Sequence, residues 1–255
     1  MYKGQHLQWL LPFWLFFNCY VPEVKEQKGV NSAAMEKRPV LIELFTSEGC
    51  SSCPPADRLL EKIAAEKDTN VYVLSFHVDY WNYIGWKDPF SQARFTERQR
   101  NYARQFSLES IYTPQMVVNG ITEFVGSDEQ RIRAAIAKNS SLSPVRIEAT
   151  RKNNTTVHLS CSWQSTGPLL LHVALVQKKA ITAVKRGENN GKTLHHVNVV
   201  RQLKTVDAIS GKGTVEIEFP SGLKETDYQL IVFTQNKKNR SIEGAGQTEV
   251  PPVQQ

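Results

Sequence analysis

Two cysteines, Cys50 and Cys53, are separated by two residues at the junction of two strongly patterned segments. The segment before them, 39–45, is apolar and partly β-branched, which predicts a buried strand. The segment after them, 56–67, repeats apolar residues at helical spacing, which predicts an amphipathic helix. Unpaired backbone N–H groups at a helix start favour a thiolate, so a redox dithiol would be well placed here. Taken alone, the motif also allows a zinc site or a structural disulfide.

The N-terminus carries the pattern of an export segment. A short apolar run, Leu7–Phe17, follows basic residues and is too short to span a bilayer, as in a signal-peptide core. We therefore expect residues 1–19 to be a signal peptide or a lipoprotein signal lipidated at Cys19, or else an uncleaved short anchor. Residues 20–37 are polar and are expected to form a tether. Each alternative places the body outside the cytoplasm, as a periplasmic, secreted or membrane-anchored protein that touches the membrane only through this end.

The remaining cysteine and the charge balance narrow the function classes. Cys161 lies in the alternating segment 157–163 and is expected to be a buried, inert thiol. No second Cys pair or His pair has ligand spacing, which disfavours a structural zinc site. In an oxidising compartment, a redox pair or plain disulfide is favoured instead. The net charge of +6 is spread without a long basic block, so no nucleic-acid partner is expected.

The chain up to residue 142 follows a simple order of predicted elements. A second buried strand leads into a loop dense in aromatic residues, which is followed by a helix with one apolar and one basic stripe. The dipeptide Asn119-Gly120 between two short apolar runs is a strong hairpin signal, and a final helix follows. After the first strand and helix, the expected elements are a strand over 70–79, a loop over 79–90, a helix over 91–106, strands over 116–118 and 121–125, and a helix from 127.

This order resembles the thioredoxin fold. The cysteine pair stands at the first strand–helix junction, and Thr113-Pro114 stands just before the third strand, as in thioredoxins. The resemblance implies a cis peptide bond at Pro114, opposite the dithiol, and such bonds usually mark a specific site. Glu43, in the strand that leads to the motif, is one residue away from the place where thioredoxins carry a buried acid.

Four longer motifs resemble a narrower family, the exported thioredoxin-like proteins of domain-of-unknown-function family 1223. The motifs are Glu43–Asp57, Ser75–Trp81, Gly85–Phe90 and Tyr112–Gly120, in the family's order, and the resemblance covers roughly residues 38–205. It implies a thioredoxin-like fold and a location outside the cytoplasm. It implies no settled activity.

From residue 143 onward the pattern changes to short alternating strands separated by polar turns, which suggests a sandwich. The predicted class is therefore α/β. A thioredoxin-like domain is expected over 38–142, with a helical and aromatic insertion over 79–106. A smaller β-sandwich-like domain is expected over 143–250, interrupted by a polar loop over 184–202.

The chemistry is expected at the dithiol. Cys50 would attack a partner disulfide, Cys53 would resolve the mixed disulfide, and Pro114 would assist. Protein or small-molecule thiols and disulfides would be the substrates, and a redox partner would recycle the pair. No cofactor is expected. The alternatives are a non-enzymatic copper chaperone or assembly factor, in which soft thiolates and imidazole bind the metal, and a surface interaction module.

A wider set of side chains is expected to support the dithiol or contact a substrate. His77 and Asp79 share a strand face, where they could carry a proton, bind a metal with the thiols, or simply hydrogen-bond and hold the aromatic loop. That loop could form a substrate rim or pack inward. The 184–202 segment could be a flap over the dithiol or an ordinary interdomain loop, and its neighbouring histidines, 195 and 196, would point apart in a strand. The full set is Glu43, His77, Asp79, Trp81, Thr113, Arg186, Glu188, Asn189 and His196, with no metal site assigned.

Overall fold

The computed structural model describes residue 1 and residues 38–66, 70–138, 142–164, 167–208, 211–220 and 222–253. The expected tether and Cys19 lie outside the described residues, as does the expected export segment apart from its first residue. Residues 37–255 form one compact unit. None of the helices in the described residues has the length and apolarity needed to cross a bilayer.

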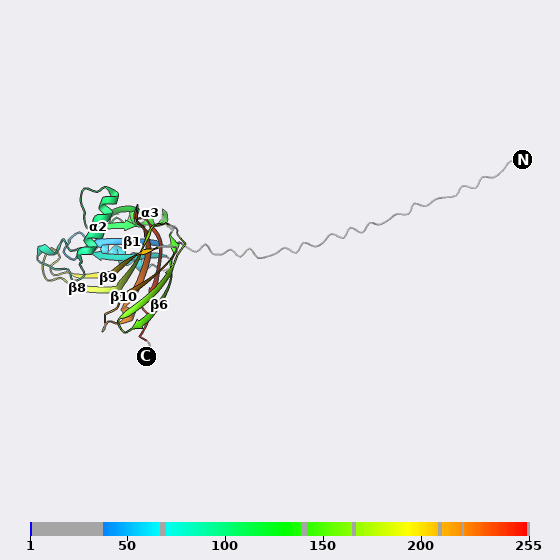
Figure 1. The fold of residues 1–255 in the computed structure, drawn as a ribbon. Coiled ribbons are helices and arrows are strands. Elements are labelled where there is room, and N and C mark those ends of the chain that lie inside the picture. The colour runs from blue at the N-terminus through cyan, green and yellow to red at the C-terminus, as the bar shows by residue number, and fades with distance from the viewer. Residues whose placement is uncertain are drawn as a thin grey trace. The chain divides into compact units, whose positions relative to one another are not determined.

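The predicted α/β class is confirmed, and the elements up to residue 138 follow the predicted order (Figure 1). The elements of the described residues are β1 (Val40–Thr46), α1 (Pro54–Ala64), β2 (Val71–His77), η1 (Asn82–Ile84), α2 (Ala93–Phe106), β3 (Gln115–Val118), β4 (Thr122–Val125), α3 (Glu129–Lys138), β5 (Ser143–Pro144), β6 (Arg146–Asn153), β7 (Thr156–Ser162), β8 (Leu169–Ala183), β9 (Thr193–Ala208), β10 (Lys212–Glu218), η2 (Glu225–Asp227), β11 (Tyr228–Asn236) and β12 (Ile242–Glu249).

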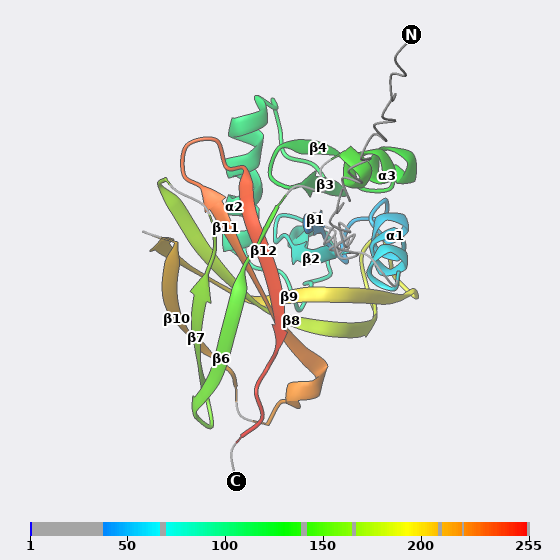
Figure 2. The same cartoon turned by 90° about the vertical axis from the view of Figure 1, so that its right-hand side faces the viewer.

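One nine-stranded mixed sheet runs through the body in the order β4-β3-β1-β2-β9-β8-β11-β12-β5. Strand β1 is parallel to β2 and antiparallel to β3, and β2 is parallel to β9 through the pair Ser75 and Val199. Strands from before and after residue 142 therefore share one sheet, as Figure 2 shows. The boundary expected at residue 142 falls inside this sheet.

The alternation of side chains along β1 explains why helices cover both faces of the sheet at this end. Leu41 and Phe45 point into a core cluster that contains Phe95 and Tyr102 of α2. The intervening residues, Val40, Ile42 and Leu44, point into a second cluster with residues of α1 and α3. Every residue of β1 is buried, which is what a central strand between two helical layers requires.

The three-stranded sheet β10-β7-β6 packs on the far half of the large sheet. Its inward residues, such as Val157 and Leu159, share one core cluster with Val173 of β8 and Val232 of β11. Residues 143–250 thus supply both layers of a sandwich, and the larger layer continues through β9 and β2 into the sheet that carries the dithiol. Cys161 lies in this core as expected, and burial raises the pKa of its thiol to about 11.

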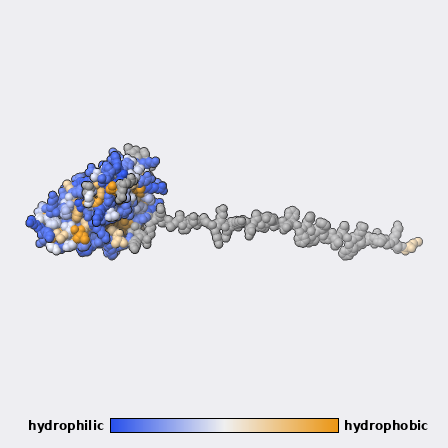
Figure 3. All heavy atoms as spheres, turned by 90° about the horizontal axis from the view of Figure 1, so that it is seen from below, coloured by the Kyte–Doolittle hydropathy of each residue, from blue (hydrophilic) through white to orange (hydrophobic). Residues whose placement is uncertain are grey.

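The polar loop predicted over 184–202 is shorter in the structure. Only residues 184–192 form a loop, because β9 begins at Thr193 and pairs with β8 as a long hairpin. Strand β12 was not predicted, since its glycines mask the strand pattern. They are there because a Cβ on Gly246 would lie 2.3 Å from the backbone oxygen of Val145. Figure 3 shows one face of the body, where hydrophilic residues predominate.

Candidate functional site

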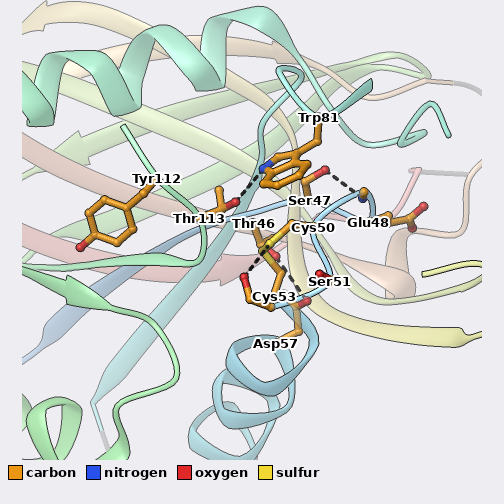
Figure 4. Close-up of a disulfide and its surroundings, with 12 residues drawn as sticks. Thr46, Ser47, Glu48, Cys50, Ser51, Cys53, Asp57, Trp81, Tyr112 and Thr113 are labelled. Atoms are coloured by element: carbon orange, nitrogen blue, oxygen red, sulfur yellow. Dashed lines mark hydrogen bonds between the residues drawn. A yellow bond between two sulfur atoms is a disulfide. The ribbon is translucent and has the colours of Figure 1, made fainter. Parts of the chain in front are cut away.

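Cys50 and Cys53 form a disulfide at the start of α1, with their Cα atoms 5.4 Å apart. Cys53 is the N-cap residue, and the next two residues are prolines, whose missing N–H groups cost nothing in the first turn. Both cysteines are fully buried, whereas Ser51 and Ser52 between them are exposed. The disulfide therefore lies just beneath the tip of an exposed turn (Figure 4).

The aromatic loop packs against this turn. The Thr113–Pro114 peptide bond is cis, as the resemblance implies, and the indole Nε1 of Trp81 donates to Thr113 Oγ1 at 2.8 Å (Figure 4). A Cβ on Gly49 would lie only 2.9 Å from Trp81 Cβ, so a glycine here lets the two segments touch. Pro114 also joins the next turn, because its carbonyl accepts from Gly126 N at 2.9 Å.

The loop 184–192, which we call the flap loop, contacts the dithiol turn. The buried Asn189 side chain donates to the carbonyls of Glu48 and Cys50, each at 2.9 Å. Glu188 accepts from the backbone N–H of Ser51 at 3.2 Å. The structure thus brings Glu188 and Asn189 to the dithiol, while Arg186 on the same loop is exposed.

A group of buried ionisable side chains, which we call the acid–imidazole cluster, lies next to the dithiol turn. It comprises Glu48, Asp57, His77, Asp88 and His196, each at most 5 % exposed. His77 Nδ1 is 2.7 Å from Asp88 Oδ2, and the two imidazole rings are 4.7 Å apart at their centroids. His196 lies between two carboxylates, with Nε2 3.4 Å from Glu48 and Nδ1 3.9 Å from Asp57.

The carboxylates set the charge of this cluster. Burial by itself would lower the pKa of His196, but Asp57 and Glu48 outweigh burial and raise it to about 10. Burial would likewise raise the pKa of Asp88, yet the charge and hydrogen bond of His77 bring it below its ordinary value. His196 is therefore a cation at neutral pH, held between two anions.

His77 is bonded to Asp88 of the aromatic loop, which is the alternative in which this histidine hydrogen-bonds an acid and holds that loop. Asp79 accepts from Thr96 Oγ1 at 2.6 Å and so fastens α2. Glu43 is turned towards α2, away from α1, which follows the cysteines. It accepts two bonds from Arg98, at 2.5 and 2.9 Å, and one from the Tyr102 hydroxyl at 2.5 Å.

Comparison with known proteins agrees with this geometry. The family described as "Protein of unknown function (DUF1223)" matches residues 41–235. The chain belongs to this family. The resemblance inferred from the four motifs is therefore confirmed.

Two solved structures illustrate the range of similarity. Protein AGR_C_4864 from Agrobacterium tumefaciens is 29 % identical, with a TM-score of 0.67 over 87 % of this chain and 99 % of that one. A domain of the outer membrane lipoprotein Omp28 from Porphyromonas gingivalis is 12 % identical, with a TM-score of 0.26 over 45 % of this chain and 92 % of that one. No curated protein matches the chain.

The sequence pattern did not single out Glu48, Asp57 or Asp88. A signal was present for Asp57, because it stands four residues after Cys53 and three before the buried Leu60, on the apolar side of α1. A carboxylate in an apolar stripe is unusual unless it has a partner. Glu48 and Asp88 lie in turns, where charged residues are ordinary, so nothing in the pattern distinguished them.

The site as described is a closed disulfide beside a buried group of carboxylates and imidazoles. Among the residues that the structure describes, no group of three or more His, Cys, Asp or Glu side chains is arranged to hold a metal ion. The chemistry available to a disulfide is reduction to two thiols and formation again from them.

Proposed function

We propose that the protein exchanges disulfides through Cys50 and Cys53 on a thioredoxin-like arrangement of β1, α1, β2, β3 and β4, outside the cytoplasm. The observation that carries the proposal is a disulfide at the N-terminus of α1, a position that a purely structural disulfide does not need. Thiolate chemistry benefits from the helix terminus, because its partial positive charge lowers the pKa of a cysteine.

In this scheme the reduced protein attacks a partner disulfide with Cys50, the first cysteine of the motif. A mixed disulfide forms between Cys50 and the partner, and Cys53 then displaces the partner. The substrates are protein or small-molecule disulfides, and a separate redox partner returns the pair to its starting state. The exposed Ser51 and Ser52 mark the side from which a partner approaches.

Access to Cys50 requires movement of its cover. Cys50 is fully buried, and Asn189 of the flap loop is bonded to its carbonyl. A partner reaches the sulfur when the turn and the flap loop separate. Those contacts are a few hydrogen bonds, each with a modest net worth of about 1 kcal/mol, so opening of this cover is energetically accessible.

The test is reaction of the purified protein with glutathione disulfide and dithiothreitol over a range of redox buffers. We expect the native protein to cycle between the Cys50–Cys53 disulfide and the dithiol. Cys50→Ser should be inert, and Cys53→Ser should accumulate a mixed disulfide detectable by mass spectrometry. Cys161→Ser is the matched control and should cycle like the native protein, because Cys161 is in the sandwich core. A pair that never cycles at any buffer ratio, or a Cys50→Ser protein that still cycles, would contradict the proposal.

A further inference from the structure

Thiol–disulfide exchange requires a group that accepts the proton of the resolving cysteine. The acid–imidazole cluster lies where it could supply that group. We propose that Asp57, held by the His196 cation, is the proton acceptor for Cys53, so that strand β9 supplies part of the redox centre. This inference rests on the proposed exchange function and deepens it. It assigns a role to residues that the motif Cys-Ser-Ser-Cys does not contain.

Cys53 and Asp57 lie one turn apart at the start of helix α1. The backbone N–H of Asp57 donates to the carbonyl of Cys53 at 3.1 Å. Side chains on a helix lean towards its N-terminus, so the Asp57 carboxylate is directed back at the turn that holds Cys53. Thr46 at the end of β1 donates to Asp57 Oδ2 at 3.3 Å, and Figure 4 shows both side chains beside the disulfide.

The link between Asp57 and His196 connects α1 to β9. Glu48 and Asp57 face His196 from the dithiol turn and from α1, while His77, paired with Asp88, faces it from β2. Within the described residues, neither ring nitrogen of His196 has a hydrogen-bond partner, and neither has Nε2 of His77 or Oε1 of Glu48. Buried polar atoms without fixed partners are uncommon, and these atoms remain open to a proton or a water molecule.

Glu43 does not suit this role, although its sequence position suggested it. Its two carboxylate oxygens are occupied by the Arg98 guanidinium and the Tyr102 hydroxyl. Those bonds also direct Glu43 towards α2 and away from the cysteines. Within the part of the chain that the structure describes, Asp57 has no bond to a guanidinium, and the His196 imidazole lies 3.9 Å from its carboxylate.

A cavity gives the cluster an outlet to solvent. It has a volume of about 310 Å³, lies between α1 and β9, and is lined by Pro54, Asp57, Arg58, Glu61, Thr193, Leu194 and His195. Asp57 is the cluster member that reaches it. A proton taken from Cys53 can therefore leave on the α1–β9 side, while the partner disulfide occupies the side of the exposed serines.

The step is balanced as follows. In the mixed disulfide, the Cys53 thiol gives its proton to Asp57 and becomes a thiolate. The thiolate attacks Cys50 Sγ, the Cys50–Cys53 bond forms, and the bond from Cys50 to the partner breaks. The partner leaves as a thiolate, so the protein dithiol has lost two electrons and the partner disulfide has gained them. Asp57 then releases the proton through the cavity.

The first experiment measures the charge coupling without any exchange reaction. In a Cys19→Ser/Cys50→Ser background, thiolate absorbance at 240 nm against pH gives the pKa of Cys53, and Cys161 does not interfere below pH 9 because its own pKa is about 11. Asp57→Asn removes an anion and should lower the Cys53 pKa by about one unit, whereas His196→Gln removes a cation and should raise it. His158→Gln, on strand β7 of the three-stranded sheet, is the matched control and should change nothing.

The opposite signs distinguish coupling from general damage to the fold. If His196→Gln does not fold, the double variant Asp57→Asn/His196→Gln removes both charges and should return the Cys53 pKa close to its original value. An Asp57→Asn protein whose Cys53 pKa equals that of the His158→Gln control, or a double variant whose Cys53 pKa stays as low as that of Asp57→Asn alone, would overturn the inference.

The second experiment follows the reduced native protein with glutathione disulfide in a stopped flow. The concentration-independent phase reports resolution by Cys53. Asp57→Asn should slow this phase about tenfold at pH 6.5 and leave it unchanged at pH 9, where the thiolate forms without an acceptor. If Asp57→Asn and the native protein resolve the mixed disulfide at the same rate at pH 6.5 as well as at pH 9, Asp57 is not the acceptor. A native protein that shows the pKa coupling but no reaction would contradict the exchange function and leave the coupling in place.

Discussion

At the scale of single residues, Gly49 controls how closely the aromatic loop approaches the dithiol turn. A Cβ at this position would lie 2.9 Å from Trp81 Cβ and 3.2 Å from its carbonyl oxygen, both closer than normal contact. We therefore expect Gly49→Ala to displace Trp81, weaken its bond to Thr113, and cost about 1–3 kcal/mol of stability. The disulfide should then be reduced several-fold faster by dithiothreitol, with a shift in tryptophan emission. Ser51→Ala on the exposed part of the turn is the control, and equal reduction rates for both variants would show that Trp81 does not shield the bond.

The residues that sequence alone identified are those whose role depends on local pattern. Cys50 and Pro114 are recognisable because a strand–helix junction and a Thr-Pro before a strand are local signals. The acid that bonds His77 could not be named from the sequence, because Asp88 reaches it from a loop that turns back, eleven positions further on. His196 was named only as part of a polar loop, because its partners, Glu48 and Asp57, are brought to it by distant pairing of strands.

At the scale of elements, the flap loop is fastened to the dithiol turn mainly by one buried side chain, with Glu188 adding an exposed bond to Ser51. Asn189 is fully buried, and its amide bonds the carbonyls of Glu48 and Cys50. We expect Asn189→Ala to leave those two carbonyls without these bonds, to loosen the loop, and to raise the rate of disulfide reduction about thirtyfold, since two bonds of about 1 kcal/mol hold the cover closed. Arg186→Ala on the same loop should have no effect. A reduction rate in Asn189→Ala equal to that of the Arg186→Ala control would mean that the loop is not the cover.

Helices and strands whose apolar residues recur at a regular spacing were predictable. Strands whose sequence is dictated by close backbone contacts or irregular pairing were not. The first helix and the first two strands follow from apolar periodicity, and the hairpin follows from Asn119-Gly120. The first part of strand β9 was predicted to be a loop that ends at residue 202. The reason is that the strand begins with several polar residues, which hide its alternation of polar and apolar side chains. The irregular register between β8 and β9, near Val176, further obscures the period.

At the scale of the whole molecule, the pairing of β2 with β9 joins the two halves of the chain. It places β9 beside the strand that ends in His77, so His196 enters the site from more than a hundred residues away in the sequence. Such long-range pairing has no local signature, which is why two separate domains were the natural prediction. The dithiol and the sandwich therefore share one framework, and the charge of His196 should contribute to the stability of both.

That contribution predicts a pH dependence of the global unfolding free energy. The pKa of His196 rises from an ordinary 6.5 to about 10 in the folded protein, so the folded state holds a proton that the unfolded state releases. The resulting stability is complete below pH 6.5 and is lost progressively as the pH rises through about 10. We expect urea unfolding of the native protein to lose roughly 3 kcal/mol between pH 7 and pH 10. Asp57→Asn should lose less over the same range, because one of the two anions that raise this pKa is gone, while His195→Gln should follow the native curve. An Asp57→Asn curve parallel to the native one would show that the His196 cation is not held by these carboxylates.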